Sequence, residues 1–202
     1  EDNGVVNTNL YYQDLEDLID RIDVSTPTAI QSANGNIGDG KRHGGSIDSS
    51  YRLSSFNLPQ LLFTARVELV DGSATDPYLN IQRPLQRQGK GNYRYGFRYD
   101  LSSQNISYGL NFSGTFDGNQ LVYDIDKVED YYMDDFIMAF LEIQGWGGLI
   151  YRFEATNPHE QYRCRIRTRY VGGTIATGRL NETEDSCSHT GEKYAIKIRG
   201  TF

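Results

Sequence analysis

The chain has 202 residues and a formal net charge of -7, a size that suits one sizeable β domain. The negative charge disfavours a nucleic-acid partner, because such binding depends on cations that neutralise phosphates. Fifteen Tyr and 21 Gly against two Met and one Trp favour pleated sheet with tight turns over packed helices. No run of about 18 apolar residues is present, so we expect no transmembrane helix.

Alternation of apolar and polar residues predicts about eight strands. The clearest is "NYRYGFRYDL", residues 92–101, in which aromatic residues take every second position and therefore share one face of a strand. The segment 14–22 also fits helical spacing, and is either a short loop helix or the upper end of the first strand. By the period-two criterion, strands are predicted at 5–13, 43–53, 63–69, 92–101, 106–116, 136–144, 149–156 and 194–202.

The connections between these strands alternate in length. Short turns are predicted at 56–60, 102–105 and 145–148, and long polar loops at 14–40, 71–91, 117–134 and 158–191. This sorting is typical of outer-membrane barrels, which have tight periplasmic turns and long external loops. We therefore predict an all-β fold in one domain, residues 1–202. It is an antiparallel up-and-down meander of about eight strands of the outer-membrane barrel type, either a partial barrel segment or a small closed barrel.

Two further features carry a resemblance to a known family. The last strand, "YAIKIRGTF", ends on the aromatic Phe202, which resembles the signal that barrel assembly machinery reads in bacterial outer-membrane barrels. The order of the segments "LYYQDLEDLID", "ANGNIGDGKRHGGSIDSSYRLSS", "FRYDLSSQNISYGLNFSG" and "RFEATNPHEQYRCRIRTRY" resembles the C-terminal part of the barrel of TonB-dependent outer-membrane receptors. The stretch "NPHEQ" departs from the turn that usually follows the family's penultimate strand.

The resemblance implies a bacterial outer-membrane location and a role in uptake of iron chelates, cobalamin or carbohydrate. Such receptors have a plug domain and about twenty-two strands. We therefore expect a fragment without a plug domain that is not transport-competent alone. Its partners would be outer-membrane lipid and lipopolysaccharide, the assembly machinery, the rest of the receptor and a small-molecule ligand. Two alternatives stay open: a soluble secreted β-sandwich that binds carbohydrate, and a complete eight-stranded barrel that acts as an adhesin or anchor.

Strand phase assigns residues to the two sides of the predicted wall. Mixed charges on the inner side predict ion pairs between neighbouring strands. The residues predicted to face lipid are Tyr93, Tyr95, Phe97, Tyr99, Tyr194, Ile196 and Ile198. The residues predicted to face the lumen are Arg52, Arg66, Glu68, Arg94, Arg98, Asp100, Arg152, Glu154, Lys197 and Arg199.

The stretch "YRCRIRTRY" places four arginines on one face of an extended strand. They either pair with acids across a hairpin, or contact an anionic ligand or the phosphates of lipopolysaccharide, since guanidinium groups suit both. Cys164 and Cys187 are an even pair that either forms a disulfide or remains as two thiols. The arginines are Arg163, Arg165, Arg167 and Arg169, and the candidate acids are Glu182, Glu184 and Asp185.

No pattern in the sequence points to catalysis. His43, His159 and His189 occur in no metal-ligand spacing, and there is no CxxC or HExxH motif, nucleophile elbow or phosphate-binding glycine loop. We therefore predict no catalytic residues, metal or cofactor, and a protein that is not an enzyme.

Overall fold

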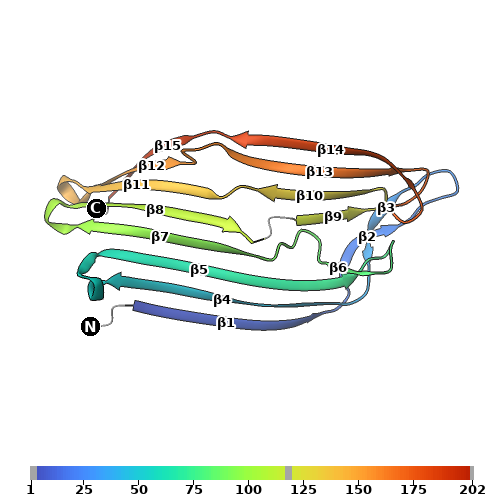
Figure 1. Ribbon diagram of the computed structural model, residues 1–202, viewed down its shortest axis with the longest axis horizontal. Coiled ribbons are helices and arrows are strands. Elements are labelled where there is room, and N and C mark those ends of the chain that lie inside the picture. Colours follow the sequence, from blue (N-terminus) through green and yellow to red (C-terminus); the bar gives the residue numbers. More distant parts are fainter. Residues whose placement is uncertain (1–3, 117–119, 201–202) are drawn as a thin grey trace.

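The computed structural model describes residues 4–116 and 120–200. Nine strands form one antiparallel sheet in the order β1-β4-β5-β7-β8-β11-β12-β15, with β6 paired to β5 (Figure 1). The all-β antiparallel prediction is confirmed, and each of the eight predicted strands is present. Their bounds are β1 Gly4–Leu15, β4 Gly40–Leu53, β5 Leu58–Thr75, β6 Gln82–Pro84, β7 Gly91–Leu101, β8 Ile106–Thr115, β11 Phe136–Gln144, β12 Ile150–Thr156 and β15 Lys193–Arg199.

A second sheet continues the first along the long axis of the molecule (Figure 1). Its order is β14-β13-β10-β9, and its strands connect directly to β15, β12, β11 and β8 of the larger sheet. A separate hairpin pairs β2 with β3. The bounds are β2 Ile19–Asp23, β3 Ser32–Asn36, β9 Gln120–Asp124, β10 Lys127–Met133, β13 Gln161–Val171 and β14 Arg179–Thr190.

These added strands correct the prediction of long polar loops. The described parts of 117–134 and 158–191 are largely strand, and 14–40 contains the hairpin of β2 and β3. The segment 71–91 contains the end of β5, the short β6 and the first residue of β7, and the rest of it is connection. The helical alternative for 14–22 is also wrong, because β1 runs to Leu15 and β2 begins at Ile19. The added strands carry polar residues on both faces, as in β14, which is exposed along almost its whole length. Such strands lack the apolar alternation that signals a half-buried strand. β13 is the exception, because its arginines alternate with Cys164, Ile166 and Tyr170.

Two of the three short turns share one sequence pattern, "LSSFN" and "LSSQN". In each, a 3-10 turn, η1 (Ser54–Phe56) or η2 (Ser102–Gln104), ends at an asparagine in the left-handed region. Asn57 has φ 59° and Asn105 has φ 55°, a conformation that asparagine tolerates better than most residues. The third turn is η3 (Trp146–Gly148). The predicted turns at 102–105 and 145–148 are confirmed, whereas the first begins at Ser54 because β5 already starts at Leu58.

The larger sheet is a single layer. Among the described residues, only five apolar side chains are buried: Ala74, Ile125, Phe140, Cys164 and Ile175. No second sheet or helix of the described chain covers the apolar side chains of the larger sheet. No helix in residues 4–116 and 120–200 is long and apolar enough to cross a membrane.

Candidate functional site

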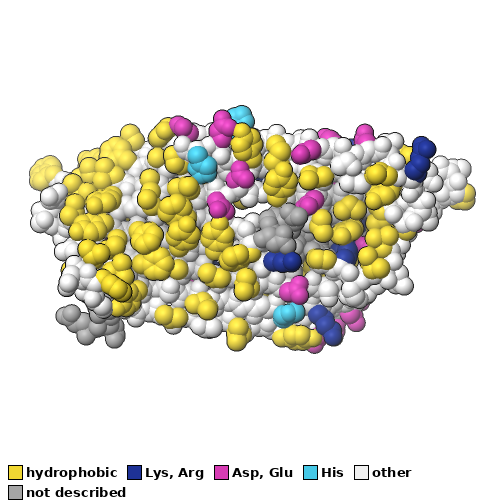
Figure 2. All heavy atoms as spheres, in the orientation of Figure 1, with side chains coloured by type: hydrophobic (Ala, Val, Ile, Leu, Met, Phe, Trp, Pro, Cys, Tyr) yellow, Lys and Arg dark blue, Asp and Glu magenta, His cyan; other side chains and the backbone are white. Residues whose placement is uncertain are grey.

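One face of the larger sheet, the apolar face, is formed by alternate residues of its strands. Phe97 of β7 lies opposite Phe63 of β5 and Leu110 of β8, and Phe97 is 39% exposed although it is flanked on both sides. Exposure rises at the sheet edges, to 81% for Leu10 and 69% for Ile196. Figure 2 shows hydrophobic side chains gathered on one face, most densely toward the short turns. The apolar face carries Val6, Leu10, Tyr12, Ile47, Tyr51, Phe63, Val67, Leu69, Tyr93, Tyr95, Phe97, Tyr99, Tyr108, Leu110, Phe112, Leu141, Tyr151, Phe153, Tyr194, Ile196 and Ile198.

The rings of the apolar face pack beside one another across the strands. The ring centroids of Tyr95 and Phe112 are 4.9 Å apart, and those of Tyr99 and Tyr108 are 5.6 Å apart. Such cross-strand pairs stabilise a sheet. They leave the outward side of each ring uncovered. The seven residues predicted to face lipid all lie on this face.

The opposite face carries a chain of ion pairs that we call the ionic ladder. Asp100 accepts from Arg52 at 2.9 Å and from Arg98 at 2.8 Å. Glu142 bridges Arg98 and Arg152, each at 2.8 Å. Alternating charges therefore link β4, β7, β11, β12 and β15, with their side chains partly shielded from solvent. The ionic ladder consists of Arg52, Asp100, Arg98, Glu142, Arg152, Glu154 and Lys197.

Strand phase identified most but not all of the charged residues on this face. Arg66 pairs with Asp48 at 3.1 Å and lies 3.6 Å from Glu68. Arg94 and Arg199 share the face, and no residue of the described chain forms an ion pair with either. The residues predicted to face the lumen therefore share the face opposite the apolar face, and the cross-strand pairing predicted for them is present.

Two residues at the centre of the ionic ladder were missed. Glu142 is the only acid in the otherwise apolar "FIMAFLEI" of β11, which is the signal that could have identified it. Phe140 is buried on the charged face, where its ring packs over Gly109. The guanidinium carbon of Arg152 lies 4.3 Å from the centre of this ring, a cation-π geometry.

The arginine stripe of β13 is mostly paired. Arg167 donates to Glu129 at 2.7 Å and lies 3.3 Å from Glu184, and Arg169 lies 3.3 Å from Glu182. Arg165 lies 3.2 Å from Glu184. Pairing across the hairpin is thus present for Glu182 and Glu184. Asp185 is no partner, because it lies opposite Ile166 on the other face.

Glu129 of β10 was not among the predicted partners. Burial raises the pKa of its carboxyl, but hydrogen bonds from Tyr131 and Arg167 outweigh burial and hold the pKa below its ordinary value. Glu129 is therefore an anion that the arginine stripe neutralises. Nothing in the local sequence links it to β13, which follows about thirty residues later.

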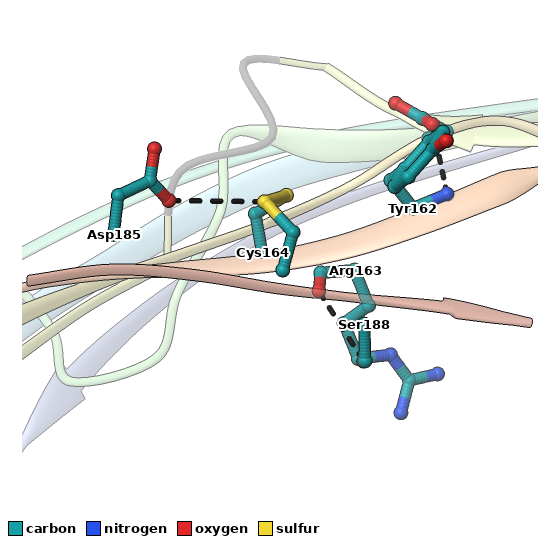
Figure 3. Close-up of a disulfide and its surroundings, with 7 residues drawn as sticks. Tyr162, Arg163, Cys164, Asp185 and Ser188 are labelled. Atoms are coloured by element: carbon teal, nitrogen blue, oxygen red, sulfur yellow. Dashed lines mark hydrogen bonds between the residues drawn. A yellow bond between two sulfur atoms is a disulfide. The ribbon is translucent and has the colours of Figure 1, made fainter.

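Cys164 and Cys187 lie directly opposite each other in β13 and β14 and form a disulfide. Figure 3 shows this bond with Asp185 beside it and Arg163 directed away from the sulfur atoms. Ser188 donates to the carbonyl oxygen of Arg163 at 3.4 Å. The disulfide therefore fixes the strand pair that displays the arginine stripe on its other face.

A second group of charges, the anchor cluster, ties three connections together at the end of the molecule away from the short turns. Arg83 donates to Asp76 at 2.6 Å and to Asp20 at 2.7 Å, and its guanidinium lies over the ring of Tyr123. Burial lowers the pKa of Arg83, but the two carboxylates outweigh it, so the pKa is raised. The anchor cluster consists of Asp20, Asp76, Arg83 and Tyr123, and sequence reasoning missed it.

The remaining predicted site residue, Phe202, lies outside the described residues. No group of three or more potential metal ligands occurs in the part of the chain that the structure describes. No protein-family profile matches the chain, and neither the curated proteins nor the solved structures contain a match.

Proposed function

We propose that the chain forms part of the wall of a β-barrel in the bacterial outer membrane, with the apolar face toward lipid and the ionic ladder toward water. The observation that carries the proposal is the single-layer sheet with exposed apolar residues on one face and paired charges on the other. Exposed apolar patches on soluble monomers rarely exceed a few hundred Å². A β-sandwich would need a second sheet over this face, and the described residues supply none.

The height of the apolar face suits a membrane. Alternate residues are apolar or glycine from Ile106, the first residue of β8, to Phe116, which directly follows the strand and whose ring centroid lies 5.2 Å from that of Tyr93. Ten residues of strand rise about 33 Å. With the strand tilt of about 40° found in outer-membrane barrels, this length spans about 25 Å of membrane, which is the height of their apolar band.

The tyrosines support a tilted wall. The cross-strand pairs form one row across the sheet, which begins at Tyr51 of β4, passes through Phe63 of β5 and ends at Tyr194 of β15. Tyr12 of β1 lies opposite His43, which is eight residues from Tyr51 along β4. Tyr12 is thus eight residues above the row that contains Tyr194. A residue rises about 3.3 Å along a strand, and neighbouring strands are about 4.8 Å apart. Across the seven strand spacings of the sheet, a strand tilt of about 38° therefore brings Tyr12 and Tyr194 to the same height in the membrane. Barrel strands tilt by about 35–45°.

Tyrosines also lie near the short turns. The aliphatic and phenylalanine side chains in the middle of the apolar face therefore have tyrosines on both sides, toward the short turns and toward the opposite end of the strands. This arrangement is the aromatic girdle expected at the two membrane interfaces. The lower tyrosines are Tyr51, Tyr99, Tyr108 and Tyr151, and the upper ones are Tyr12, Tyr93 and Tyr194.

The kind of barrel is proposed from the sequence resemblance. On that basis the chain is a segment of a TonB-dependent receptor that takes up iron chelates, cobalamin or carbohydrate and needs the remainder of the receptor to transport. The second candidate is a complete eight-stranded barrel. It is favoured by one observation: β1 and β15, the two edges, run antiparallel, and both carry apolar residues on the same face, so they could pair.

The test is performed on the gene product at its natural length. The proposal predicts that it sediments with the outer membrane, resists extraction by high salt or alkaline carbonate, and requires detergent to remain monodisperse. A monodisperse protein without detergent would overturn it. Heat-modifiable migration of the 202-residue chain alone would favour the closed eight-stranded barrel over the receptor segment.

A further inference from the structure

A cavity of about 420 Å³ opens where the two sheets meet. Its lining combines positive charge with aromatic and polar side chains: Arg87, Thr115, Gln120, Tyr131, Tyr132, Met133 and Arg163. β10 ends at Met133 and β11 begins at Phe136, so the cavity, which Met133 lines, lies beside a break in the strand ladder. Its volume lies in the range of small-molecule sites, about 300–1,000 Å³.

Arg163 brings an unneutralised charge to this cavity. It is the first arginine of the β13 stripe, and its cross-strand neighbours are Met133 and Ser188, where Arg167 and Arg169 have glutamates. Its guanidinium contacts the sulfur of Met133 at 3.5 Å. No carboxylate within residues 4–116 and 120–200 forms an ion pair with it.

Arg87 approaches from the connection between β5 and β7, and its backbone is held in place. Its N–H donates to the carbonyl oxygen of Leu121 at 2.9 Å. The side-chain amide of Gln86 donates to the carbonyl oxygen of Tyr123 at 2.7 Å and accepts from its N–H at 2.8 Å. These bonds dock the connection on the free edge of β9. The Arg87 guanidinium forms no ion pair with any described residue.

The remaining lining suits the carbon skeleton of a ligand. Tyr131 lies on the same face of the smaller sheet as Arg163 and is partly exposed, and aromatic rings supply contact area with few internal rotations to lose. The hydroxyl of Tyr131 is already committed to Glu129, at 2.7 Å. Because Glu129 is itself paired with Arg167, its charge opposes an anion in the cavity less than a free carboxylate would.

We propose that this cavity binds a small phosphate monoester, with Arg87 and Arg163 on the phosphate and the ring of Tyr131 against the attached carbon skeleton. Two guanidinium groups that pair with no carboxylate of residues 4–116 and 120–200 favour a phosphate monoester, which carries about -1.5 to -2 charge at pH 7, over a carboxylate with a single charge. Guanidinium groups bind phosphate oxygens in pairs of hydrogen bonds. The site goes beyond the proposed wall function and does not require that the chain be in a membrane.

The experiment is calorimetric titration with glucose 6-phosphate, with glucose as the uncharged match, and a parallel titration with vesicles that contain phosphatidic acid. We expect one glucose 6-phosphate per chain and no heat from glucose. Saturable binding of phosphatidic acid vesicles without glucose 6-phosphate binding would assign the phosphate to a lipid headgroup and would support the same site. The absence of binding to both phosphate probes would overturn the proposal.

Three variants locate the binding. Arg87→Ala and Arg163→Ala should each weaken affinity at least tenfold. The matched control is Arg169→Ala, which removes an arginine of the same stripe whose partner, Glu182, is about half exposed, and it should change affinity less than twofold. Equal losses in Arg163→Ala and Arg169→Ala would show general charge attraction and would contradict the site. Circular dichroism of each variant verifies the fold. Because Arg87 and Arg163 lie on separate elements, one variant still tests the site if the other fails to fold.

Discussion

Replacement of Asp76 by Asn should open the anchor cluster without unfolding the meander. Asp76 is fully buried and accepts from Arg83 at 2.6 Å and from the amides of Tyr78 and Leu79 at 2.9 and 2.8 Å. Removal of one partner from a buried ion pair costs about 3–5 kcal/mol. Asp20 still pairs with Arg83, so we expect the lower end, about 3 kcal/mol. That is about a hundredfold in the local opening equilibrium, at about 1.4 kcal/mol per factor of ten.

Amide hydrogen exchange measures this opening residue by residue. The amides of Tyr78, Leu79 and Tyr123 should lose about a hundredfold of protection, while the amide of Leu110 in β8 should not change, because local units open independently of the rest. The control is Asp71→Asn, since that side chain, in β5 five residues before Asp76, is 73% exposed. A change below threefold at Tyr78, or an equal loss at Leu110, would refute the reasoning.

Two further results are expected from substitutions elsewhere. The pKa of Glu129 lies below its ordinary value of 4.5, so the charge of Glu129 stabilises the smaller sheet above pH 4.5, and this stabilisation is lost as the pH falls through the folded-state pKa. Glu129→Gln should remove this part of the acid dependence of stability, measured as urea midpoints from pH 7 to 3. An unchanged acid dependence in the variant would exclude Glu129 as its source. A Cβ at Gly109 would clash with a backbone oxygen and lie 2.8 Å from the Phe140 ring, so Gly109→Ala should lower the free energy of unfolding by about 1–3 kcal/mol. The control is Gly191→Ala, which has open space around it and should lower the free energy of unfolding by less than about 0.5 kcal/mol. Similar urea midpoints for the two variants would contradict the packing of Phe140 over Gly109.

The sequence was sufficient to predict the strands that have one apolar face. In β7 the aromatic residues recur at every second position, and the same signal identified the other strands of the meander. It failed for β14, because a strand that is polar on both faces has no period-two contrast. β13 does alternate, with arginines on one face and Cys164, Ile166 and Tyr170 on the other, and its arginine stretch was predicted to be extended, although the segment around it was predicted to be a polar loop. The hairpin partners of Arg167 and Arg169 were still predictable, because the sequence has glutamates shortly before β15, where the chain returns from the hairpin.

The missing parts of the site depend on contacts between distant segments. Arg83 and Asp20 are 63 residues apart, and each lies in a polar connection without a motif. Glu142 was missed because its role as a bridge follows from the registers of β11 with both neighbours. Register is set by turn geometry and by the bulge after Arg52, which strand phase alone does not predict.

The most direct test of the membrane wall uses two adjacent residues of β8 that point to opposite faces. Leu110 is on the apolar face and 43% exposed, whereas Asn111 is on the face of the ionic ladder. Tryptophan is introduced at either position in the protein at its natural length, reconstituted in vesicles of brominated lipid, and the quenching of its fluorescence is measured against the unsubstituted protein. The proposal predicts strong quenching at residue 110 and weak quenching at residue 111. Equal quenching, or stronger quenching at residue 111, would contradict it.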